Sequence, residues 1–195
     1  MKDHRSNTMK DNRSNMPGDA KLVFKGELFE VWQWQQEMFD GSKAIFERIV
    51  GQDSVQVIAV VGSEIMIQDQ EQPARVSKFL SLPGGRCEWG EDSLACAKRE
   101  FLEETGYASD DWELLQNVSP MGKMAWTIYT YIARDCRKVA EPHLDAGEKI
   151  ENRLISFDEF TKLEDEPRFR SLAPTLIRAQ YDGSKRAELQ RRIFG

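Results

Sequence analysis

The sequence contains no long hydrophobic run. Its longest stretch of consecutive aliphatic residues is Val57–Val61, whereas a membrane-spanning helix needs about 20 apolar residues. The first twenty residues are polar, with no apolar segment after Met1 and Lys2, so no secretory signal is predicted. We therefore expect a cytoplasmic protein with no membrane partner.

The sequence also has few cysteines and no excess of positive charge. The three cysteines, Cys87, Cys96 and Cys136, are odd in number and lack C-x-x-C spacing, which predicts reduced thiols and neither a disulfide framework nor a zinc site. Lys and Arg number 27 against 33 Asp and Glu, for a net charge of −6. This balance predicts no dedicated nucleic-acid surface. A small anionic substrate fits it where a metal supplies positive charge.

The 195 residues are 40% hydrophobic and 31% charged, which is typical of one main globular domain with small extensions. Residues 1–20 hold a near-duplicated polar segment and are predicted to be a flexible tail. Residues 21–52 have strand-like apolar patterns on both sides of a turn signal at Asp40-Gly41. This arrangement predicts an antiparallel N-terminal extension.

Residues 53–165 predict the main domain, and residues 166–195 a C-terminal helical segment from Leu172 to Phe194. Strands come first, one helix follows a Pro-Gly-Gly break, and a second helix begins after Ser156 with Glu159 at the capping-box position. This order predicts an α+β sandwich. The expected strands are Ser54–Val61, Glu64–Gln68, Val76–Leu82, Trp112–Val118, Met124–Ala133 and Arg153–Ser156.

The middle helix carries the candidate chemistry. Asp92 or Ser93 is its predicted N-cap and Gly106 its stop. Three carboxylates, Glu100, Glu103 and Glu104, fall on one patch of this helix and repel one another. A hard divalent cation such as Mg²⁺ or Mn²⁺ would relieve the repulsion. The alternative is a solvated acidic helix face.

This segment resembles the Nudix box, G-x5-E-x7-R-E-U-x-E-E-x-G-U, where U is a bulky apolar residue. Phe101 and Tyr107 occupy U positions as aromatics. The resemblance implies a Nudix-type α/β/α sandwich with a mixed sheet, and hydrolysis of a nucleoside diphosphate linked to another moiety. The fixed positions are matched by Gly85, Glu91, Arg99, Glu100, Glu103, Glu104 and Gly106.

The resemblance also implies roles for these residues. Glu100 and Glu104 would be the main metal ligands, Glu103 would ligate directly or through water, and the carbonyl of Gly84 would complete the shell. Glu91 would pair with Arg99 and orient the loop against the helix. The bound Mg²⁺ or Mn²⁺ would neutralise pyrophosphate charge and activate water.

Beyond the box, the chain is similar to the ADP-ribose and nucleotide-sugar pyrophosphatase branch. An acidic segment, residues 144–151, resembles that branch's late loop, and implies Glu148 as the general base with Glu151 in reserve. The chain departs from the branch at residues 70–73, which read Gln-Glu-Gln-Pro where many members have an arginine. The residues considered in its place are Arg75, Arg86 and Lys123.

The N-terminal extension has two apolar faces. Trp32, Trp34 and Phe39 are interpreted either as stacking partners for a nucleobase or as the core of a dimer interface, and the sequence favours a homodimer. The predicted function is a Mg²⁺-dependent pyrophosphatase acting on ADP-ribose or a nucleotide sugar. The alternatives are a nucleoside-triphosphate or dinucleotide hydrolase, and a non-catalytic nucleotide-binding module.

Overall fold

The computed structural model describes residue 12 and the ranges 16–73, 75–119, 122–169 and 181–195, together with residue 179. Most of the predicted N-terminal tail therefore lies outside the described residues. So do residues 172–178 and 180 of the predicted C-terminal helix. Within the described residues, no helix is long and apolar enough to cross a membrane.

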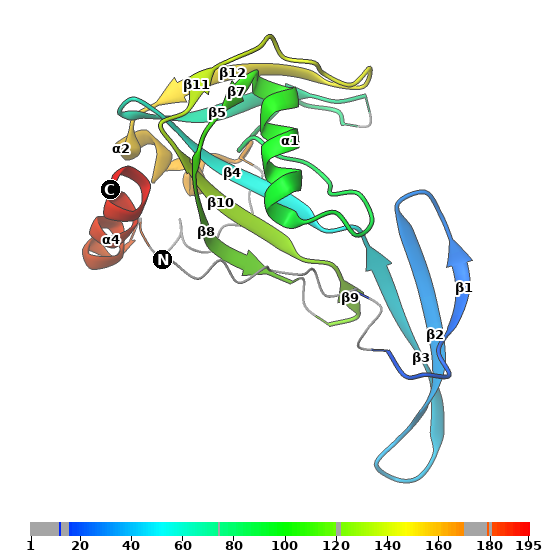
Figure 1. Cartoon of the computed structure of the whole chain (residues 1–195). Helices are drawn as coiled ribbons and strands as arrows, with labels where there is room; N and C mark the ends of the chain where they lie inside the picture. The colour runs from blue at the N-terminus through cyan, green and yellow to red at the C-terminus, as the bar shows by residue number, and fades with distance from the viewer. Residues whose placement is uncertain (1–11, 13–15, 74, 120–121, 170–178, 180) are drawn as a thin grey trace.

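The N-terminal extension is an antiparallel sheet that projects from the rest of the chain (Figure 1, lower right). It consists of β1 (Lys21–Lys25), β2 (Phe29–Glu37) and β3 (Lys43–Gly51), with β9 (Met124–Ala125) added in parallel to β3. The predicted turn is confirmed, because Gly41 joins β2 to β3 with a φ of 82°. A left-handed conformation of this kind favours glycine.

The central sheet is mixed. Its strand order is β12-β5-β4-β10-β8, and β10 runs parallel to β4 whereas the other neighbours are antiparallel. A short strand, β6, pairs with β5, and β7 pairs with β11 in a small separate sheet. The bounds are β4 Ser54–Val61, β5 Glu64–Glu71, β6 Phe79–Ser81, β7 Tyr107–Ala108, β8 Asp111–Val118, β10 Ile128–Arg134, β11 Arg137–Lys138 and β12 Lys149–Ile155.

Helices cover both faces of this sheet, which confirms the predicted α+β sandwich (Figure 1). On β4, Ile58 faces a core shared with α2 and α4, whereas Val57 faces the core beneath α1. Successive side chains of a strand point to opposite faces, so one buried strand supplies both cores. The helices are α1 (Ser93–Thr105), α2 (Phe157–Phe160), the 3₁₀ helix η1 (Leu163–Asp165) and α4 (Gly183–Phe194).

Two predicted strands differ from the structure. The strand expected over Val76–Leu82 is reduced to β6, because only Phe79–Ser81 pair with β5. The strand expected over Met124–Ala133 is split into β9 and β10, which belong to different sheets. Both segments have strand-like composition, and their pairing depends on where the neighbouring strands lie.

Candidate active site

Helix α1 is held at both ends as the sequence predicts. The Asp92 carboxylate accepts hydrogen bonds from the backbone N–H groups of Leu94 (3.0 Å) and Ala95 (3.1 Å). At the other end Gly106 adopts a φ of 73°, and its N–H donates to the carbonyl of Leu102. These caps position Glu104 on a buried face of the helix and leave Glu103 exposed.

Two glycines bring the loop before α1 against the sheet and the helix. A Cβ at Gly84 would lie 2.2 Å from the Val55 carbonyl oxygen, and its φ is 141°. A Cβ at Gly85 would lie 2.3 Å from a carboxylate oxygen of Glu100. A side chain at either position would therefore push the loop away from β4 or from the helix. The close approach lets the Gly84 N–H donate to Glu104 Oε2 at 2.8 Å.

Among the carboxylates of the site, Glu104 has the most strongly shifted pKa. Burial raises its pKa to about 8, opposed by hydrogen bonds from Gly84 and Gln68, and the negative charges of Glu100 and Glu148 raise it further. Burial also raises the pKa of Glu100, although Arg99 opposes that shift. A carboxylate that is buried beside like charges is costly to ionise. A bound cation would remove that cost.

Arg99 ties the loop to the helix. Its Nε and Nη2 donate to the two carboxylate oxygens of Glu91 at 2.9 and 2.8 Å, and its Nη1 donates to Glu100 (2.8 Å) and Glu103 (3.1 Å). These hydrogen bonds, with that to Glu91 the largest cause, raise the pKa of Arg99, and the same contact lowers the pKa of Glu91. Glu91 also accepts from the N–H of Glu88 at 2.8 Å. A bidentate pair of this kind fixes orientation as well as charge.

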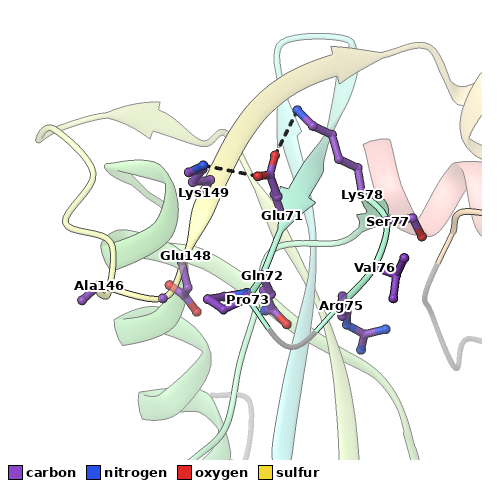
Figure 2. Close-up of a pocket in the computed structure, with 11 residues that line it drawn as sticks. Glu71, Gln72, Pro73, Arg75, Val76, Ser77, Lys78, Ala146, Glu148 and Lys149 are labelled. Carbon is purple, nitrogen blue, oxygen red and sulfur yellow. Dashed lines mark hydrogen bonds and ion pairs between the residues drawn. The ribbon is translucent and has the colours of Figure 1, made fainter.

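A cavity of about 760 Å³, the central cavity, brings most of the predicted site residues together. A second cavity of about 480 Å³, the outer cavity, adjoins it and shares Gln72, Arg75 and Glu148 with it. In Figure 2, Glu71 of the outer cavity is paired with Lys78 and Lys149. The predicted residues that line the central cavity are Gly84, Glu100, Glu104, Glu148, Arg75 and Arg86.

The other predicted residues lie outside that lining. Glu103 points to solvent beside Arg99. Trp32 and Trp34 lie on β2 in the N-terminal sheet, where their indole N–H groups donate to Glu30 and Gln36 at 3.0 Å. Trp32 and Trp34 therefore do not line the central cavity that contains Glu100, Glu104 and Glu148 of the same chain.

Sequence reasoning missed the side chains that shape the inner wall of the central cavity. Gln70 is buried and lines it together with Phe79. The guanidinium of Arg75 lies 4.4 Å from the centre of the Phe79 ring, a cation–π contact. The alternation of glutamines along β5 was a signal that could have indicated these residues.

The donor set suits a hard divalent cation. Carboxylates from α1 and from the turn before β12 face one cavity, and Mg²⁺ and Mn²⁺ prefer such oxygen ligands. Backbone geometry adds to the fit, since the β4 N–H groups of Val55 and Val57 donate to the carbonyls of Gly85 and Pro83, whereas no β4 N–H in the described part of the chain donates to the carbonyl of Gly84. Glu100, Glu104 and the Gly84 carbonyl are the oxygen groups that would hold the ion, and Glu148 faces the same cavity.

A family comparison identifies this arrangement. The NUDIX domain model matches residues 51–176, well over half of the chain. The chain belongs to the NUDIX family. A methanol dehydrogenase activator of Bacillus methanolicus is 27% identical over 166 residues, spanning 83% of this chain and 89% of that protein. An ADP-ribose pyrophosphatase of Bacillus subtilis is 24% identical over 145 residues, spanning 72% and 78%.

A solved structure supports the same fold. The crystal structure of an ADP compounds hydrolase superposes with a TM-score of 0.69 at 21% identity, covering 85% of this chain and 93% of that one. The predicted resemblance to the ADP-ribose branch of the Nudix family is thus confirmed. So is the predicted enzyme class, a Nudix pyrophosphohydrolase.

The predicted state of two cysteines in the Nudix segment is wrong. Cys87, in the loop, and Cys96, in α1, form a disulfide with their Cα atoms 5.3 Å apart. The sequence predicted reduced thiols because the cysteines are odd in number and lack C-x-x-C spacing. The loop reverses direction between them and brings the backbones within bonding range, a proximity that depends on tertiary structure.

Reduction of this disulfide is expected to lower the free energy of unfolding by about 2–3 kcal/mol, because the bond closes a short loop in the unfolded chain. Thermal unfolding with and without dithiothreitol measures the effect. The double variant Cys87→Ser/Cys96→Ser is the control and should be insensitive to reductant, since Cys136 is buried and burial raises its pKa to about 12. Three titratable thiols in the denatured, unreduced protein would contradict the bond.

The raised pKa of Glu104 predicts a pH dependence of stability. Its carboxyl has a pKa of about 8 in the folded protein, against an ordinary value of 4.5, so the folded state binds the proton more tightly. That stabilisation is present below pH 4.5 and is lost as the pH rises through 8. In EDTA, Tm should fall by roughly 5–10 °C between pH 5.5 and 8.5. Parallel profiles for wild type and Glu104→Gln would contradict this assignment.

Proposed function

We propose that this Nudix hydrolase cleaves the pyrophosphate bond of a nucleoside diphosphate linked to a second moiety, ADP-ribose or a nucleotide sugar. The products are a nucleoside monophosphate and a phosphorylated second moiety. The observation that carries the proposal is the convergence of Glu100, Glu104 and Glu148 on one cavity that also contains Arg75 and Arg86. The similarity to a protein named ADP-ribose pyrophosphatase supports this choice of substrate.

In the proposed site, one set of groups binds the cation, and a second set positions the loop before α1. Glu100, Glu104 and the Gly84 carbonyl would hold Mg²⁺ or Mn²⁺, and Glu103, which is exposed beside Arg99, would ligate directly or through water. The ion, when bound, neutralises pyrophosphate charge and lowers the pKa of water. Arg99 and Glu91 position the loop against α1 through their bidentate pair.

We assign the general base to Glu148. It lies in the turn just before β12 and lines both cavities, close enough to Glu100 and Glu104 for its charge to raise their pKa values. A base supplied from outside α1 leaves the helical carboxylates to the cation. Glu151 lies within β12, opposite Asp69, and does not line either described cavity.

Arg75 and Arg86 are the proposed phosphate contacts. Both are exposed, and both line the central cavity near the carboxylates. They occupy the role of the arginine that the segment at residues 70–73 lacks. The outer cavity, which Arg75 also lines, has room for the second moiety of the substrate.

The N-terminal extension supports the proposal of a homodimer. Large apolar side chains on β1 and β3, among them Phe24 and Ile45, are exposed. A patch of this kind on a projecting sheet is typical of an interface, and in a dimer Trp32 and Trp34 of the partner are the residues that could reach a neighbouring site. Sedimentation at micromolar concentration tests the dimer. A cytosolic location and the lack of a nucleic-acid surface stay predictions from the sequence.

Turnover of a substrate panel tests the function. The panel contains ADP-ribose, nucleotide sugars, dinucleoside polyphosphates and nucleoside triphosphates, each with Mg²⁺, Mn²⁺ or EDTA. We expect metal-dependent cleavage of the first two classes, with a strong loss in Glu148→Gln. Turnover confined to triphosphates or dinucleotides would contradict the substrate, and tight binding without turnover would contradict catalysis.

A further inference from the structure

Three glutamines occupy every second position at the end of β5 and just beyond it. Gln68 and Gln70 are buried and Gln72, just after the strand, is half-buried. Alternate residues of a strand share a face, and on this face Met66 belongs to the core beneath α1. The face thus changes from apolar to amide where β5 passes Glu104.

The three side-chain amides form a chain of hydrogen bonds with one direction, the glutamine ladder (Gln68, Gln70 and Gln72). Gln72 Nε2 donates to Gln70 Oε1 (3.4 Å), and Gln70 Nε2 donates to Gln68 Oε1 (2.7 Å). Gln68 Nε2 then donates to Glu104 Oε2 at 3.1 Å. Gln70 Nε2 also donates to Ser81 Oγ at 2.9 Å. Every amide donates toward the carboxylate.

This direction leaves Gln68 one orientation. Its carbonyl oxygen is needed to accept from Gln70, so its N–H faces Glu104. A flipped amide would place an oxygen against the carboxylate and an NH₂ group against that of Gln70, which loses two bonds between buried groups. Burying an amide without hydrogen-bond partners costs free energy. If this face of β5 served packing alone, an apolar side chain would fill the same space without that cost.

The ladder decides which oxygen of Glu104 is engaged. Oε2 accepts from both Gln68 Nε2 (3.1 Å) and the Gly84 N–H (2.8 Å). Two donors on one oxygen orient the carboxylate, and among the contacts of the described residues none is to Oε1, which would be open to a cation. Asn152 lies opposite Gln68 in the pairing of β12 with β5, and its Nδ2 donates to the Glu104 carbonyl at 3.1 Å. Both the side chain and the backbone of Glu104 are therefore held from this strand pair.

We propose that Gln68 is a positioning residue of the cation site, oriented by Gln70 and acting through Glu104. The inference rests on the proposed function, in which Glu104 is a metal ligand. Groups that orient metal ligands commonly contribute a factor of ten or more in metal affinity. Gln72 also lines the outer cavity (Figure 2). The ladder therefore connects the space for the second moiety with the cation site.

Binding of Mn²⁺, followed by electron paramagnetic resonance, tests the proposal without relying on activity. We expect Gln68→Met, which keeps the length of the side chain and removes the donor, to weaken Mn²⁺ binding roughly tenfold. The matched control is Gln116→Met on β8, three strands from β5 in the same sheet, which should bind Mn²⁺ as wild type does. At saturating Mn²⁺, Gln68→Met should lower kcat and leave KM for the nucleotide nearly unchanged.

A double variant separates a positioning role from a general structural one. If Gln68 acts through Glu104, Gln68→Met should add little loss of Mn²⁺ affinity in the Glu104→Gln background. An equal loss in both backgrounds would overturn the proposal, as would wild-type affinity in Gln68→Met. Where Gln68→Met does not fold, Gln70→Met decides, because it leaves Gln68 in place and removes the bond that orients it. If Glu104→Gln itself binds Mn²⁺ normally, the metal site of the proposed function fails first.

Discussion

Replacing Glu104 with glutamine is expected to lower kcat/KM at least a hundredfold and to weaken metal binding. The change removes the charge and keeps the shape, since the amide oxygen can still accept from Gly84 and Gln68. A factor of one hundred corresponds to about 2.7 kcal/mol of lost transition-state stabilisation, within the several kcal/mol that a bound cation supplies. Steady-state kinetics with Mg²⁺ and a metal titration measure both effects.

The same variant should not be less stable. A buried neutral amide avoids the cost of ionising a carboxyl whose pKa is about 8, so at pH 8.5 in EDTA its Tm should equal or exceed that of the wild type. Glu141→Gln serves as the control, because Glu141 is exposed and pairs only with Lys138 among the contacts described. Wild-type turnover in Glu104→Gln would remove Glu104 from the metal site.

Replacing Gly84 with alanine is expected to destabilise the fold by about 3 kcal/mol or more and to abolish activity. The new Cβ would lie 2.2 Å from the Val55 carbonyl oxygen, on a backbone with φ of 141°. Strained backbone costs about 1–3 kcal/mol, and an overpacked contact costs a similar amount. Moving the loop would also break the bond from the Gly84 N–H to Glu104.

Gly62→Ala is the matched control for this effect. Gly62 has a φ of 62° in the turn between β4 and β5, and a Cβ there would meet nothing within 4 Å. It should cost only about 1 kcal/mol through its backbone conformation. Chemical denaturation of the two variants compares them directly, and equal losses would show that the contact with β4 contributes nothing.

The elements that the sequence predicted best are those with local signals. Helix α1 begins after Asp92 and ends before Gly106, because a capping carboxylate and a left-handed glycine act on their own neighbouring residues. The capping box of Ser156 and Glu159 at α2 is confirmed for the same reason. The strand β4 has the predicted bounds, since a continuous apolar run is typical of a strand buried on both faces.

The elements that it predicted poorly depend on remote partners. β6 is shorter than the predicted strand because its pairing with β5 covers only a few residues. Cys87 and Cys96 form a disulfide because a loop turns back onto a helix. The spacing of cysteines in the sequence does not predict that turn. The tryptophans on β2 have aromatic rings suited to stacking on a nucleobase. Their sheet, however, is separate from the central sheet that lines the cavity.

The sequence by itself determined the family, the fold class and the carboxylates of α1, because these follow from a fixed motif and from helical spacing. Tertiary structure alone decided which of the carboxylates is buried, which oxygen of Glu104 is engaged, and that Glu148 faces the same cavity. The physical reason is that hydrogen bonds and burial depend on distances between residues such as Gln68 and Glu104, which are 36 positions apart in the chain. Only the packed sheet and helix bring such residues into contact.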